Sequence, residues 1–99
     1  MAKKDSGPLH PGEVLLEEFI KPMKISQHQL ALNMRVAPQK INDIVQGKRG
    51  VTADTALRLS LALGTSAEFW MGLQSDYDLE MALEAGGEKM KREVIRVNE

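Results

Sequence analysis

Two short amphipathic segments lie only three residues apart near the middle of this sequence, and this spacing limits how the chain can fold. The first segment, QHQLALNM, follows Ser26, a residue type that caps helix N-termini well. The second begins at Pro38, where proline suits the first turn of a helix, and it stops before Gly47. The apolar residues at helical spacing in both segments are Leu30, Ala31, Met34, Ile41, Ile44 and Val45. The pattern predicts two short helices packed together across a tight turn.

Similar signals predict three further helices, and thus a five-helix, all-α fold. One helix precedes the central pair and closes at Pro22, because the residue before a proline avoids helical angles. Another follows the cap Thr52 and is nearly apolar all round, so we expect it to be the central buried helix. The last follows the cap Ser66, and the stretch AGGE at 85–88 is expected to break it.

A chain of 99 residues has room for one core, so we expect a single domain over residues 10–85. Residues 1–9 are expected to form a flexible arm, and residues 86–99 a short C-terminal tail. Within the tail, EVIRV fits a short edge strand, a fraying helix or a disordered arm, and the sequence does not choose between them.

The sequence lacks the features of a metal site, an enzyme or a membrane protein. It has no cysteine, and His10 and His28 are isolated, without the spacing of metal ligands. There is no glycine-rich phosphate loop and no Ser/His/Asp arrangement, so we expect no cofactor and no enzyme activity. No apolar run approaches the ~20 residues of a membrane span, and no signal peptide is present, which indicates a cytoplasmic protein.

The charged residues are unevenly distributed, although the net charge is only −1. Residues 35–58 hold five basic side chains and two acidic ones. Residues 59–87 hold no basic side chain and five acidic ones, Glu68, Asp76, Asp78, Glu80 and Glu84. One surface could therefore meet phosphate while another meets a cationic partner.

The second central helix has an outward face suited to nucleic acid. Two short helices joined by a tight turn form a helix-turn-helix unit, whose second helix enters the major groove of DNA. The candidate base-reading residues are Gln39, Asp43 and Gln46, opposite the apolar side, with Lys40 and Asn42 on the flanks. Asp43 could instead orient Lys40. An ordinary solvated face is the alternative interpretation of the whole set, since exposed polar faces are common.

Polar and basic residues around this helix are candidates for contacts to the DNA backbone. Ser26 and Gln27 begin the preceding helix, where hydroxyl, amide and backbone N–H groups suit phosphate. Lys48 and Arg49 follow the base-reading helix, and Arg35 lies in the turn.

The stretch SQHQLALNMRVAPQKINDIVQGKRGVTADTALRLSLALG (26–64) resembles the five-helix Cro/cI-like (lambda-repressor-like, XRE) helix-turn-helix domain. The flanking runs HPGEVLLEEFIKPMKIS and TSAEFWMGLQSDYDLEMA are similar to the HigA (VapI) antitoxins. The resemblance implies a homodimeric antitoxin that binds double-stranded operator DNA, represses its own operon and neutralises a HigB-type mRNA-cleaving toxin. The alternative is a stand-alone repressor without a toxin partner. An RNA-binding module is a weaker third choice, because the aromatic residues are not interleaved with the basic ones.

Two positions depart from the family pattern. Arg35 stands where the family usually has glycine, which should cost about 1 kcal/mol in a left-handed turn. Ala37 stands where Ser or Thr often caps the reading helix.

Three of the four aromatic residues of the chain fall within a short stripe after position 68. The stripe consists of Phe69, Trp70, Leu73 and Tyr77. It fits either the core of the domain or a dimer or partner interface, since interfaces favour aromatic residues.

Overall fold

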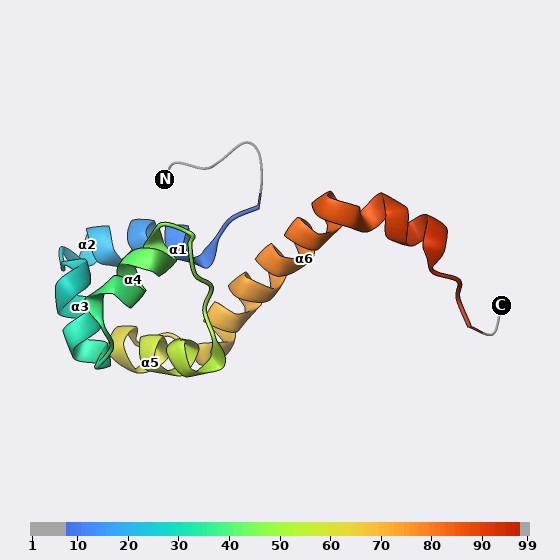
Figure 1. Cartoon of the computed structure of the whole chain (residues 1–99). Coiled ribbons are helices and arrows are strands. Elements are labelled where there is room, and N and C mark those ends of the chain that lie inside the picture. The colour runs from blue at the N-terminus through green and yellow to red at the C-terminus, as the bar shows by residue number, and fades with distance from the viewer. Residues whose placement is uncertain (1–7, 98–99) are drawn as a thin grey trace.

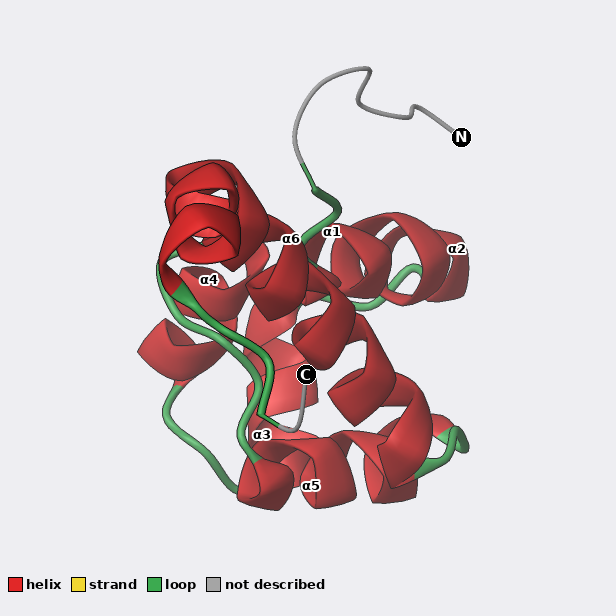
Figure 2. Cartoon of the chain, turned by 90° about the vertical axis from the view of Figure 1, so that its right-hand side faces the viewer, coloured by secondary structure: helices red, strands yellow, loops and turns green. Residues whose placement is uncertain are grey.

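The computed structural model describes residues 8–97, and all regular structure within them is helical (Figures 1 and 2). Five helices follow one another along the chain, the first of which is divided into three segments. The elements are α1 (Pro11–Val14), a π-helical segment (Leu15–Ile20), α2 (Lys21–Met23), α3 (Gln27–Met34), α4 (Pro38–Val45), α5 (Ala53–Leu63) and α6 (Ala67–Glu93). The predicted all-α, five-helix fold is confirmed. Of the predicted N-terminal arm, residues 1–7 lie outside the described part, and Leu9 packs against the core.

The first helix does not close at Pro22, and that prediction is wrong. The helix continues through the proline to Met23, and Lys24 then turns the chain with a left-handed φ of 57°. A proline inside an α-helix would press against the carbonyl group four residues before it. Here the preceding turns are π-helical, with the Lys21 N–H donating to the Leu16 carbonyl five residues back. We attribute the tolerance of Pro22 to this wider ladder of hydrogen bonds.

The central helix pair α3 and α4 forms as the sequence predicts. Ser26 caps α3 by accepting a hydrogen bond from the Gln29 N–H at 2.9 Å. Arg35 adopts the left-handed conformation, with φ 60°, and Ala37 makes no side-chain cap for α4. The buried residues of the two helices are Leu30, Ala31, Met34, Ile41 and Ile44. Burial of these side chains holds α4 in a fixed orientation on α3.

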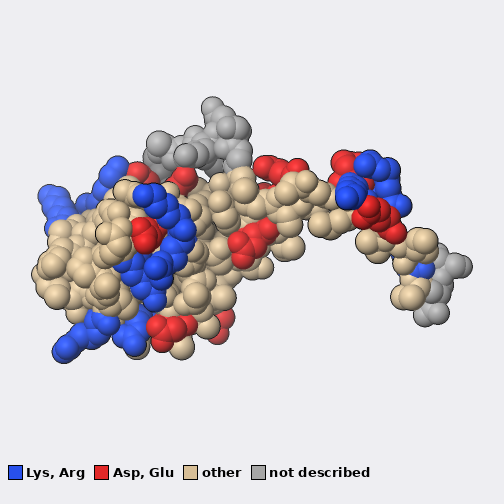
Figure 3. Space-filling model, in the orientation of Figure 1, with Lys and Arg blue, Asp and Glu red and all other residues tan. Residues whose placement is uncertain are grey.

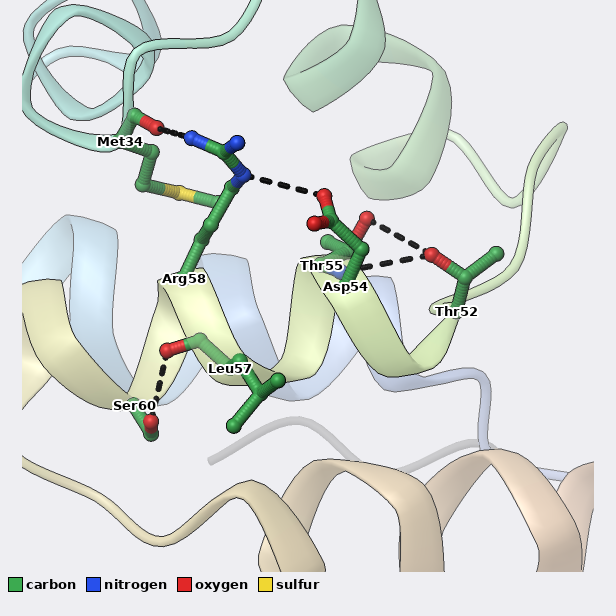
Figure 4. A network of polar contacts seen from close by, with 7 residues as sticks. All are labelled: Met34, Thr52, Asp54, Thr55, Leu57, Arg58 and Ser60. Atoms are coloured by element: carbon green, nitrogen blue, oxygen red, sulfur yellow. Dashed lines mark hydrogen bonds and ion pairs between the residues drawn. The ribbon is translucent and has the colours of Figure 1, made fainter.

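The prediction that the helix after Thr52 is buried all round is wrong. Leu57 is 56% exposed and Leu61 is 87% exposed, whereas Ala56 and Leu59 are fully buried. Neighbouring helices cover only one side of α5. Arg58 of α5 bonds the end of α3, because its Nη1 donates to the Met34 carbonyl at 2.8 Å, and its Nε donates to Asp54 of the same helix at 3.0 Å (Figure 4).

Helix α6 leaves the compact body and extends well beyond it (Figure 1). The molecule therefore measures 53 × 28 × 21 Å. The predicted break at 85–88 is confirmed at Gly86, whose non-helical angles interrupt the helix, but a further helical stretch, which was not predicted, follows it to Glu93. One glycine with non-helical angles bends the axis there, and the hydrogen-bonded turns on either side persist. Residues 94–97 form no strand, so the edge-strand interpretation of EVIRV is not supported in the described part of the tail.

Trp70 lies in the core of the body, where its side chain is fully buried. Its Nε1 donates to the Thr65 hydroxyl at 2.6 Å. Its ring contacts Phe19 and Phe69, at centroid distances of 5.4 and 5.0 Å, and these two rings also contact each other. The assignment of Trp70 to an interface is therefore wrong. Phe69 remains 41% exposed, and Leu73 and Tyr77 are half-buried.

Candidate nucleic-acid interface

Helix α4 turns the predicted base-reading residues away from the core. Ile41 and Ile44 are fully buried on its inner side, while Gln39 and Gln46 are exposed on its outer side. Lys40, Asn42 and Asp43 are half-buried. The outer side therefore carries amide, ammonium and carboxylate groups, the chemistry that matches base edges in the major groove.

Asp43 organises two neighbours on this outer side. The Gln39 Nε2 donates to the Asp43 Oδ1 at 2.8 Å, and the Arg49 guanidinium lies 3.9 Å from the Asp43 Oδ2. The partner of Asp43 in the structure is thus Gln39 and not Lys40. This contact holds one N–H of the Gln39 amide and leaves its oxygen and second N–H available, the pair of groups that matches adenine.

Asn42 faces α3, in addition to its place on the flank of α4. Its Nδ2 donates to the Gln27 Oε1 at 3.2 Å, across fifteen residues of sequence. The bond joins the first residue of α3 to the middle of α4. The sequence does not reveal this contact. It uses one N–H of the Asn42 amide and leaves the oxygen and the second N–H available for a base edge.

The basic residues of the candidate interface surround α4. Lys48 and Arg49 are exposed in the loop that joins α4 to α5, and Arg35 is exposed in the turn before α4. Ser26 keeps its hydroxyl proton for another acceptor, because as a cap the oxygen accepts. On the face seen in Figure 3, most Lys and Arg side chains lie over the compact body, and the middle of α6 carries Asp and Glu.

Arg58 is a residue that the sequence analysis did not assign to the site. It lines a shallow hollow together with Asn33, Arg35 and Leu61, at the end of the unit formed by α3 and α4. Its guanidinium is held by Met34 and Asp54, as Figure 4 shows. Arg58 lies on the helix after the helix-turn-helix unit, and no sequence pattern predicts that its side chain reaches back to that unit.

His10, which the sequence analysis considered only as a metal ligand, is a buried cap of the first helix. Its Nδ1 accepts a hydrogen bond from the Gly12 N–H at 2.9 Å, and its ring lies edge-on to Tyr77, with centroids 4.7 Å apart. Burial lowers the pKa of His10 below its usual 6.5, against the opposing effect of the Glu13 and Asp78 carboxylates. No group of three potential metal ligands occurs among residues 8–97.

We expect the fold to lose stability as the pH falls below 6.5, because a protonated His10 cannot accept the Gly12 N–H. The unfolded chain then binds a proton more readily than the folded chain, so stability rises with pH from the lowered folded pKa up to 6.5. Thermal unfolding between pH 5 and 8 measures this dependence. His10→Asn, which keeps a capping acceptor without titrating, should flatten it. An unchanged profile in that variant would assign the dependence to another group.

The described part of the chain contains no helix that is both long and apolar enough to span a membrane.

Comparison with known proteins places this geometry among DNA-binding regulators. A family model described as helix-turn-helix matches residues 16–70. Virulence-associated protein I of Dichelobacter nodosus is 50% identical over 80 residues, which are 81% of this chain and 74% of that protein. The Pseudomonas aeruginosa antitoxin HigA, solved with the higBA promoter, superimposes with a TM-score of 0.88 at 43% identity, covering 91% of this chain and 98% of that one. Antitoxin GraA, solved in complex with its operator, has a TM-score of 0.88 at 41% identity over the full length of both chains.

Proposed function

This chain belongs to the helix-turn-helix family, in the branch of the HigA (VapI) antitoxins, and we propose that it binds operator DNA and represses its own operon. The observation that carries the proposal is the outer side of α4, with Gln39 and Gln46 exposed beside the basic loop of Lys48 and Arg49. Similar chains have been solved with promoter and operator DNA. Such a protein acts in the cytoplasm, where the DNA is, and not as an enzyme.

Base reading and backbone contact should separate in two single variants. Gln39→Ala should weaken operator binding by about 1–3 kcal/mol and relax the base preference at one position of each half-site. Lys48→Ala should weaken binding to operator and random duplexes alike. It should also reduce the slope of log affinity against log salt concentration by about 1. Fluorescence anisotropy on the chain's own promoter at several salt concentrations measures both effects. Equal losses of Gln39→Ala on operator and random DNA would contradict the base-reading assignment.

We propose that the active species is a homodimer, joined through the extended part of α6. Leu79 and Leu83 are each 62% exposed and Met90 is 51% exposed, and all three lie beyond the compact body. Two copies joined there would present two α4 helices to half-sites about 34–36 Å apart. Sedimentation analysis should show a dimer at micromolar concentration, and Leu79→Lys with Leu83→Lys should shift it to monomer. A wild-type monomer that binds the palindrome without cooperativity would exclude this arrangement.

The second part of the proposed function is neutralisation of a HigB-type toxin. Asp76, Glu80 and Glu84 are exposed along α6, on an element separate from the base-reading helix. Ribonucleases that act on messenger RNA need positive surface for their substrate, and an acidic helix could cover it. A stand-alone repressor would carry these acids for solubility alone.

A further inference from the structure

The loop between α4 and α5, residues 46–52, carries Lys48 and Arg49 and so decides where two proposed phosphate contacts lie. Its second residue, Gly47, has a left-handed conformation with φ 78°, and its last residue, Thr52, caps α5. Within it, the Lys48 N–H donates to the Asp43 carbonyl at 2.8 Å, which fixes the start of the loop to α4. The end of the loop is held from another element.

That element is α6, through the side chain of Gln74. The Gln74 Oε1 accepts a hydrogen bond from the Val51 N–H at 2.7 Å, and the Gln74 Nε2 donates to the Asp78 Oδ1 at 2.9 Å. Asp78 thereby sets the orientation of the amide, with the oxygen toward the loop. The Val51 side chain is 4% exposed and belongs to the core, so Gln74 bonds the backbone at the point where the loop enters the body.

Gly50 lets the loop approach this amide closely. A Cβ at position 50 would lie 2.9 Å from the Gln74 Oε1 and 3.0 Å from its Cδ and Nε2, so the Gln74 amide would have to shift to admit it. Gln74 and Gly50 therefore form one fitted contact, two residues from Lys48 and next to Arg49.

We propose that Gln74 is a positioning residue for DNA binding, which holds the α4–α5 loop so that Lys48 and Arg49 meet the phosphate backbone. The inference rests on the proposed DNA-binding function and assigns a part in it to the proximal half of α6. Gln74 touches no base. Its effect on DNA affinity is exerted through the α4–α5 loop and does not depend on the sequence of the DNA.

Two substitutions at this position separate the hydrogen bond from packing. Gln74→Met has a similar length but no acceptor. Gln74→Glu combined with Asp78→Asn keeps an acceptor for the Val51 N–H, a hydrogen bond between positions 74 and 78, and the net charge. For Gln74→Met, we expect faster hydrogen exchange at the Val51 amide, about tenfold weaker binding to operator and random duplexes alike, and a salt slope reduced by about 1–2. The variant with Gln74→Glu and Asp78→Asn should bind within about threefold of the unmodified chain. Thermal unfolding of both variants checks that the fold persists.

A double-mutant cycle tests whether the effect passes through the loop. In a chain that already carries Lys48→Ala and Arg49→Ala, Gln74→Met should reduce affinity by less than about twofold. A full tenfold loss in that background would overturn the proposal, as would unchanged affinity of Gln74→Met despite faster Val51 exchange, or a loss confined to the operator. Failure of the unmodified chain to bind its promoter would contradict the proposed DNA-binding function itself. That outcome is measured on the unmodified protein, so it is distinct from a failure of the Gln74 variants.

Discussion

Gly12→Ala should destabilise the fold by roughly 3 kcal/mol and abolish measurable operator binding at micromolar protein. A Cβ at Gly12 would overlap the carbonyl oxygen of Ile44, which is backbone and cannot rotate away. That carbonyl accepts the Gly47 N–H and closes the C-terminal end of α4. The first helix and the base-reading helix would have to move apart, so stability and DNA binding should fall together. Thermal unfolding and anisotropy on the promoter measure the two effects.

Gly72→Ala is the matched control, because it adds the same methyl group to a helical glycine of α6. A Cβ at Gly72 meets no atom within 4 Å. This variant should be as stable as the unmodified chain or more stable by about 0.4–1 kcal/mol, with operator binding retained. If Gly12→Ala melts at the same temperature as Gly72→Ala, the close packing of α1 on α4 is not what holds the base-reading helix.

Reversing the exposed acids of α6 should slow association with a cationic toxin about 10–100-fold at low salt. Asp76→Lys, Glu80→Lys and Glu84→Lys together replace three negative charges with three positive ones. They lie in the stretch 59–87, which otherwise contains no basic residue. Asp78 is left unchanged, since it accepts the Gln74 Nε2 and supports the α4–α5 loop. Stopped-flow mixing with the product of the neighbouring gene measures the rate, and operator affinity should not fall.

Neutral replacements at the same three positions, Asn at 76 and Gln at 80 and 84, form a graded control. They should slow association by an intermediate factor if the surface acts through charge. An unchanged association rate in the charge-reversed variant would indicate that the toxin binds another surface of the chain. If the unmodified chain forms no complex with the product of the neighbouring gene, the stand-alone repressor becomes the better description.

The sequence alone determined the local features of the fold, because the interactions behind them span few residues. Ser26, Thr52 and Ser66 each cap a helix through an N–H three residues later, as their positions predict. The side of α4 that turns outward follows from the helical period, so the placement of Gln39 and Gln46 was predictable. The left-handed conformation of Arg35 was expected from the family resemblance, because the family usually has glycine at that place in the turn.

The tertiary structure decided which faces are covered and which polar groups meet. Leu61 and Trp70 are both large apolar residues at helical spacing, yet one is 87% exposed and the other fully buried. Burial depends on where the other helices lie, and hydrophobic periodicity describes only the residue's own helix. The bonds of Asn42 to Gln27 and of Gln74 to Val51 join residues 15 and 23 positions apart. No local pattern encodes such pairs, because only packing of α3 against α4, and of α6 against the loop, brings the partners within hydrogen-bonding distance.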